Sequence, residues 1–162
     1  MGQKIAFGFG MLANQMFPAA LGVFIIVLVQ DLGFAAMLWG IIQFLPRIFD
    51  AITDPIMGFI SDNTRSNYGR RRQYVFIGGI LMGLAYIAMW QLHKGDGVTY
   101  NFIYFLSWSL VFYQGLTIFS VPYVAMGYEI SEDFHERTQI MAVAQFIGQW
   151  AWVIAPWFWV IL

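Results

Sequence analysis

Long apolar stretches separated by short polar segments dominate this chain, and the pattern predicts helices that cross a membrane. A spanning helix needs about 20 largely apolar residues to cross about 30 Å of hydrocarbon. Five stretches satisfy this requirement, at about 5–29, 35–60, 74–91, 100–126 and 140–162. A membrane β-barrel would instead show short alternating segments. We therefore predict an all-α polytopic membrane protein.

Composition excludes several classes of protein. The 162 residues are 60% hydrophobic and only 10% charged, against about 25% charged in soluble domains. A soluble domain of this size could not hide so much apolar surface from water, which excludes an ordinary soluble enzyme and a nucleic-acid binder. The chain has no cysteine, so neither a disulfide framework nor a thiolate metal site is expected. No catalytic constellation is visible, and we predict neither enzyme activity nor an organic cofactor.

The basic residues between the spans predict how the chain is oriented. Most of them fall on one side if the N-terminus is cytoplasmic, and only Lys94 falls on the other. The residues on the predicted inner side are Lys4, Arg65, Arg70, Arg71, Arg72 and Arg137. The tryptophans expected near the outer interface are Trp39, Trp90, Trp157 and Trp159. We therefore expect an integral protein of the cytoplasmic (inner) membrane with its N-terminus inside.

The second span contains three charged residues, Arg47, Asp50 and Asp54. Each would cost roughly 2.5–3.5 kcal/mol at the middle of a membrane helix if nothing compensated for it. The two acids are four residues apart, which places them on one helix face, and Arg47 lies on the same side. Because nearby carboxylates repel, they are expected to hold a proton or to share a cation such as Na⁺. The alternative is a buried Arg47–Asp50 ion pair that only locks helices together.

Uncharged polar residues in three other spans predict a cavity. Each one alone is typical of an interhelical hydrogen bond. Together they predict a polar cavity bounded by the first, second, fourth and fifth helices. These residues are Asn14, Gln15, Thr117, Ser120, Gln145 and Gln149.

The loop after the second span combines two glycines with an acid and several arginines. Gly58 permits a close helix approach and Gly69 suits a tight turn. Asp62 is placed to pair with an arginine or to cap a helix. Positive charge that only sets topology explains Arg65 and Arg70, but it does not explain their spacing from the glycines.

The loop after the fourth span offers acids that could face those arginines. Asp133 and Glu136 have the spacing of a capping box, which predicts a short surface helix, and Arg137 follows them. Exposed charge pairs are worth only about 0–1 kcal/mol each. A network of them would nevertheless latch a cytoplasmic gate reversibly.

These motifs resemble one transporter family. The segment 47–58, followed by Asp62-Asn-Thr-Arg65 and Gly69-Arg70-Arg71, is similar to the glycoside–pentoside–hexuronide:cation symporter family of the major facilitator superfamily. Segments 4–10, 117–123 and 133–137 fit the same family in the same order. The resemblance implies twelve helices in two six-helix halves, and transport by alternating access.

The resemblance also implies roles for individual residues. Asp50 and Asp54 would bind the coupling cation with help from the Thr117 hydroxyl. Gly58, Asp62, Gly69 and Arg70 would be part of the inward gate. From the charges of the two loops we expect the gate to include Arg65, Asp133 and Arg137 as well. The substrate cavity would include Asn14, Gln15, Arg47, Ser120 and Gln145.

Five positions depart from the melibiose-transporting pattern of that family. There the pattern has a Lys, two acids, a Trp and an Arg, which engage the sugar or support the cation site. The corresponding residues here are Asn14, Gln15, Ser120, Val124 and Gln145. These departures argue against galactoside transport, and they leave open another sugar, a lipid-like substrate or another organic solute, with Na⁺ or H⁺ as the coupling ion.

Length bears on the domain organisation. We expect residues 1–162 to form a single transmembrane domain, the first five helices of the N-terminal six-helix half of a longer twelve-helix transporter. The predicted function is cation-coupled secondary transport of a sugar or related organic solute. The alternative is a truncated, transporter-like subunit with a structural role in a larger membrane complex. Expected partners are the lipid bilayer, a small-molecule solute, and the remaining transporter half or other membrane subunits.

Overall fold

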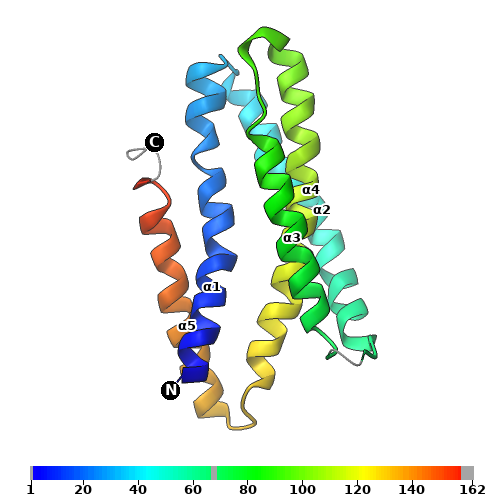
Figure 1. The fold of residues 1–162 in the computed structure, drawn as a ribbon, viewed down its shortest axis with the longest axis vertical. Coiled ribbons are helices and arrows are strands. Elements are labelled where there is room, and N and C mark those ends of the chain that lie inside the picture. Colours follow the sequence, from blue (N-terminus) through cyan, green and yellow to red (C-terminus); the bar gives the residue numbers. More distant parts are fainter. Residues whose placement is uncertain (1, 67–68, 158–162) are drawn as a thin grey trace. The chain divides into compact units, whose positions relative to one another are not determined.

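The computed structural model describes residues 2–66 and 69–157, and these residues form helices and connecting turns without a β-strand (Figure 1). The all-α prediction is therefore confirmed for the described residues. The α-helices are α1 Gly2–Leu21, α2 Ala36–Asn63, α3 Arg72–Met89, α4 Val98–Glu129 and α5 Phe134–Ile154. Two short helices connect them, a π-helix η1 at Ile26–Asp31 and a 3₁₀ helix η2 at Lys94–Asp96.

Within residues 2–66 and 69–157, four helical segments are long and apolar enough to cross a membrane. They are Ile5–Asp31, Ala36–Asn63, Arg72–Met89 and Val98–Glu129, and they correspond to the first four predicted spans. The segment α5 is a helix but begins earlier than the fifth predicted span, at Phe134, and its first turn contains Glu136 and Arg137. Residues 158–162 of that predicted span, with Trp159, lie outside the described residues.

The sequence predicts one continuous helix for the first span, but the structure shows an α-helix followed by a π-helix. The helix α1 ends at Leu21 and the π-helix η1 follows it. Pro18 lies inside α1 and has no backbone N–H to donate. The N–H groups of Gly22 and Val23 then donate to carbonyls only three residues back, both at 3.1 Å. This tightened turn is the physical reason why the α-helix ends there.

The chain divides into two compact units, and the first contains residues 1–27 and 124–162. In this unit α1 and α5 lie side by side and run parallel (Figure 1). A Cβ placed on Gly8 would meet Ile147, and one placed on Gly148 would meet Met11. Buried small residues at Ala144 and Gly148 of α5 let the two backbones approach closely, as is common between membrane helices.

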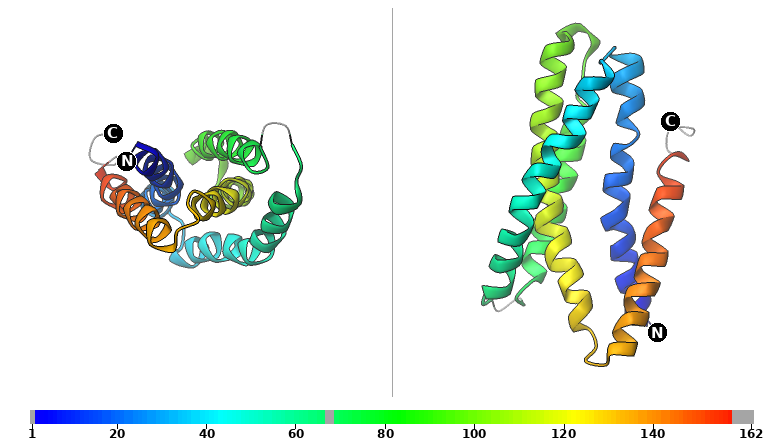
Figure 2. Two further views of the ribbon diagram at one scale, coloured as in Figure 1. Left: turned by 90° about the horizontal axis from the view of Figure 1, so that it is seen from below. Right: turned by 180° about the vertical axis from the view of Figure 1, so that it is seen from behind.

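The second unit contains residues 28–123 and holds α2, α3 and most of α4. Figure 2 shows α3 beside α4, and the two helices run antiparallel. They touch through two glycines. A Cβ on Gly78 would lie 2.5 Å from the backbone nitrogen of Phe119, and a Cβ on Gly115 would lie 2.9 Å from that of Met82. Because backbone meets backbone here, this contact fixes the position of α4.

The expected interfacial tryptophans differ in exposure. Trp39 is half-buried, whereas Trp90 and Trp157 are exposed. The side chains of Lys4 and Lys94 lie outside the described part of the chain. The predicted orientation therefore stays a prediction.

Candidate functional site

The two acids of α2 face a hydroxyl of α4. Thr117 Oγ1 lies 2.8 Å from Asp54 Oδ1 and 3.4 Å from Asp50 Oδ1. A hydroxyl has one proton and donates to one acceptor at a time, so the shorter contact is the stronger hydrogen bond. The three residues that the sequence nominated for cation binding are thus brought together.

Local geometry explains how this cluster forms. Asp50 and Asp54 are one turn apart on α2, so their carboxylates share a face. The helices α2 and α4 run parallel, and a Cβ on Gly58 would lie only 3.8 Å from Val121 Cγ1. Thr117 is almost fully buried, whereas the Asp50 side chain is 16% exposed. The hydroxyl therefore lies at the base of the cluster and the carboxylates lie nearer its surface.

The chemistry of this cluster suits a small cation or a proton. It offers two carboxylates and one hydroxyl, and hard cations prefer oxygen ligands of this type. Among the described residues, no group of three or more His, Cys, Asp or Glu side chains could hold a metal ion. The cluster thus offers oxygen donors from two helices, α2 and α4.

Arg47 lies at the edge of the carboxylate cluster and contacts two groups. Its Nη1 is 4.0 Å from Asp50 Oδ2, and its Cζ is 5.5 Å from the centroid of the Tyr113 ring. Arg47 and Asp50 both belong to α2, and each contacts α4, Arg47 at the Tyr113 ring and Asp50 at the Thr117 hydroxyl. The Arg47 side chain is 65% exposed, so the pair is not buried as the alternative expected. A role for the pair in joining helices stays a prediction.

Sequence reasoning missed Tyr113. Its ring is buried, with 3% exposure, beneath the Arg47 guanidinium. The sequence does hold one signal, because Tyr113 precedes Thr117 by four residues and therefore lies one turn away on the same face of α4. An aromatic residue one turn from a predicted cation ligand is a candidate partner for a nearby arginine.

The residues expected to line the substrate cavity fall in both units. Arg47 and Ser120 belong to the unit of residues 28–123, whereas Asn14, Gln15 and Gln145 belong to the other unit. A cavity that combines them stays a prediction.

Two of these residues have partners inside their own unit. The buried Asn14 donates from Nδ2 to Met11 Sδ at 3.7 Å. Gln15 Oε1 accepts a hydrogen bond from Trp152 Nε1 at 3.3 Å. Trp152 was not nominated from the sequence, where it is one of several tryptophans near the end of the chain.

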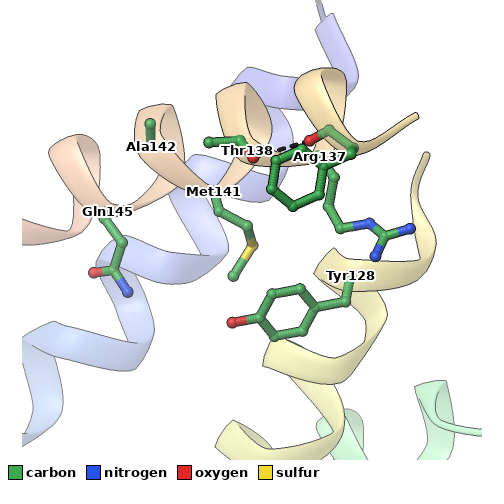
Figure 3. A pocket seen from close by; sticks show the side chains of 7 residues that line it. Tyr128, Arg137, Thr138, Met141, Ala142 and Gln145 are labelled. Atoms are coloured by element: carbon green, nitrogen blue, oxygen red, sulfur yellow. Dashed lines mark hydrogen bonds between the residues drawn. The ribbon is translucent and has the colours of Figure 1, made fainter. Parts of the chain in front are cut away.

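Gln145 lines a pocket of about 460 Å³ between the end of α4 and the first turns of α5. Figure 3 shows Met141 and Tyr128 pointing toward one another, with Arg137 and Gln145 at opposite ends. The pocket therefore combines a cationic end and an amide end with an apolar middle. It brings together one residue predicted for the gate and one predicted for the substrate cavity.

An ion pair in the described part of the loop between α2 and α3 was partly expected. Asp62 pairs with Arg71, which was not among the nominated gate residues. Gly69 has a φ of +98°, so it makes the tight turn predicted for it. Thr64 Oγ1 and the Tyr74 hydroxyl are 2.7 Å apart and join the end of α2 to α3.

The loop between α4 and α5 is organised around the start of α5. Asp133 caps this helix, because its Oδ1 accepts from the backbone N–H of His135 at 2.7 Å. The predicted short surface helix is therefore wrong, since the cap starts α5 itself. Ser131 holds the neighbouring charges, donating to Glu136 Oε2 at 2.9 Å and accepting at its carbonyl from Arg137 Nε at 3.3 Å. Pairing between this loop and the α2–α3 loop stays a prediction.

Comparison with known proteins places this geometry in context. A family profile described as MFS/sugar transport protein matches residues 6–160. The chain is 34% identical to an uncharacterized symporter, sll1374, of Synechocystis sp., over 85% of the chain and 26% of that protein. It is 26% identical to the inner membrane symporter YicJ of Escherichia coli, over 94% of the chain and 32% of that protein.

A vertebrate protein is similar as well. The chain is 31% identical to the sodium-dependent lysophosphatidylcholine symporter 1 of Xenopus tropicalis, over 83% of the chain and 26% of that protein. The chain thus spans about a quarter to a third of the length of these relatives.

Proposed function

This chain belongs to the MFS/sugar transport protein family of membrane symporters, and we propose that it provides the cation site of a secondary transporter coupled to Na⁺ or H⁺. Family membership confirms the resemblance seen in the sequence motifs. It also places the chain among integral membrane transporters rather than enzymes. The transported solute in this proposal is a sugar or a related organic molecule that moves by alternating access.

One observation carries the proposal, the convergence of Asp50, Asp54 and Thr117. Intramembrane acids are expensive, and they mark ion or proton pathways in membrane proteins. These two share one hydroxyl, at 2.8 and 3.4 Å. A cation between the carboxylates would relieve their mutual repulsion, and a proton on one of them would do the same. Release of that ion restores the repulsion, which supplies a force for a conformational change.

The name of one relative bears on the coupling ion. The relative from Xenopus tropicalis is described as sodium-dependent. The oxygen-only donor set of this chain suits Na⁺. Proton coupling is the second possibility, because a pair of carboxylates can share a single proton.

The family relationship also suggests an architecture and a class of substrate for the full-length protein. The described helices would be the first five of the N-terminal six-helix half of a twelve-helix transporter, with a cytoplasmic N-terminus in an inner membrane. The apolar middle of the pocket lined by Tyr128 and Met141 favours a solute with an apolar part. A lysophospholipid-like amphiphile is therefore the second candidate substrate, beside a sugar or glycoside.

The decisive experiment removes each charge without changing the size of the side chain. The full-length gene product would be reconstituted in liposomes as wild type, Asp50→Asn and Asp54→Asn. Uptake of labelled methyl glycosides and of labelled lysophosphatidylcholine would be driven by a Na⁺ or a pH gradient. Each substitution removes one of the two negative charges that would attract the cation, an interaction worth up to about 4 kcal/mol, so we expect the apparent cation affinity to fall about tenfold or more.

Asp96→Asn is the matched control, because it makes the same chemical change in an exposed loop. It should behave as wild type. Ion-driven accumulation that is unchanged in both Asp50→Asn and Asp54→Asn would contradict the proposed function.

A further inference from the structure

The Arg47 guanidinium lies between an acid and an aromatic ring, and it is fully engaged by neither. The separation of 4.0 Å between Arg47 Nη1 and Asp50 Oδ2 is too long for a hydrogen bond. The separation of 5.5 Å between Arg47 Cζ and the Tyr113 ring lies within the range of a cation–π contact. The arginine is thus held beside Asp50 without donating to it.

This position keeps a carboxylate oxygen accessible. Asp50 Oδ1 faces Thr117 at 3.4 Å and Asp50 Oδ2 faces Arg47 at 4.0 Å. If the guanidinium closed onto Oδ2, it would form a charge-assisted hydrogen bond of the stronger kind. An entering cation would then have to displace that bond. Arg47 is therefore a competitor for the same oxygen that a coupling ion would use.

Tyr113 is placed to weaken this competition. Its ring is buried with 3% exposure, so it is held firmly by α4, whereas the Arg47 side chain is 65% exposed and has room to move. A rigid ring that attracts a mobile guanidinium stabilises the position away from the acid. The cation–π contact stabilises the arrangement in which Arg47 stays away from Asp50, so less free energy is needed to keep the two side chains apart.

We propose that Tyr113 is a positioning residue that sets the cation affinity of the Asp50–Asp54 pair by holding the Arg47 guanidinium at a distance. This inference rests on the proposed function of the acid pair as a cation site. It adds a residue outside that site and a physical reason for its effect. It also makes the affinity adjustable without changing any ligand of the cation.

The test is a double-mutant cycle in the full-length, detergent-solubilised protein. The variants are Tyr113→Leu and Tyr113→Phe, each in the wild-type and in the Arg47→Gln background. Cation binding is measured by calorimetric titration with NaCl, with choline chloride as the blank, and by proton uptake with a pH-indicator dye. Near-ultraviolet circular dichroism confirms that each variant is folded.

Tyr113→Leu removes the ring and should weaken cation binding about 2- to 30-fold, the range that corresponds to a cation–π contact. Tyr113→Phe keeps the aromatic ring and should retain most of the cation affinity of the wild type. In the Arg47→Gln background the Leu substitution should have no effect, because the competitor is gone.

Two results would overturn the inference. One is a Leu substitution that leaves the affinity unchanged, and the other is an equal loss in both backgrounds, which would indicate a packing role for Tyr113. Failure of the proposed function gives a different result. In that case Asp50→Asn, with Tyr113 and Arg47 intact, would bind cations as the wild type does.

Discussion

Gly78 is the position where one added methyl group should disturb this protein most clearly. A Cβ there would lie 2.5 Å from the nitrogen of Phe119, 2.9 Å from the oxygen of Gly115 and 2.9 Å from the carbonyl carbon of Ile118. All three are backbone atoms of α4, so no side chain can rotate away. Ordinary contact begins near 3.4 Å, and the helices must therefore separate by about 0.9 Å, the difference from 2.5 Å. Overpacking of this kind typically costs about 1–3 kcal/mol.

Gly83 provides the matched control on the same helix. A Cβ on Gly83 meets nothing within 4 Å, so Gly83→Ala should gain about 0.5–1 kcal/mol from higher helix propensity. The two alanine variants should consequently differ by roughly 1.5–4 kcal/mol in their free energy of unfolding. The measurement is unfolding of the micelle-bound protein by titration with sodium dodecyl sulfate, followed by circular dichroism. Equal stability of Gly78→Ala and Gly83→Ala would show that α3 and α4 are not in backbone contact.

Two further predictions concern single hydrogen bonds. Thr117→Val replaces the hydroxyl by a methyl group of similar size and should lower the apparent cation affinity about tenfold or more. Thr117→Ser keeps the hydroxyl and should have an affinity near that of the wild type. Calorimetric titration with Na⁺ measures both variants, and equal affinity of the Val and Ser variants would contradict a role for the hydroxyl. Asp133→Ala removes the cap of α5 and should lower the stability of the protein by about 1 kcal/mol, whereas Asp133→Asn keeps a capping oxygen and should change the stability little. Loss of the cap should speed amide hydrogen exchange in the first turn of α5. Unchanged exchange in the Ala variant would contradict the capping role.

The sequence was sufficient to predict the elements whose cause is local. Apolar length predicts α2, α3 and α4, because a bilayer requires a minimum run. The spacing of Asp50 and Asp54 places both on one face, because helical periodicity leaves little choice. Asp133 was recognised as a cap for the same reason, although the helix that it starts is α5 and not a separate short one.

Partners that depend on tertiary packing could not be predicted. Asp62 pairs with Arg71, but Arg65 is nearer along the chain, Arg70 and Arg72 flank Arg71, and all have the same chemistry. Tyr113 meets Arg47 only because of the way α2 lies against α4. The end of α1 at Leu21 also escaped prediction, since apolar residues continue beyond it and the tightened turn depends on two backbone hydrogen bonds.

The glycine contact between α3 and α4 has a mechanical consequence. Where the two backbones touch, no side chain lies between them that could rearrange, so we expect α3 and α4 to tilt together as one rigid body. The contact between α2 and α4 is easier to rearrange, because it is made by side chains, including the Thr117 hydroxyl. If an ion binds Asp50 and Asp54 as proposed, strain from its arrival or departure would be relieved by sliding between α2 and α4.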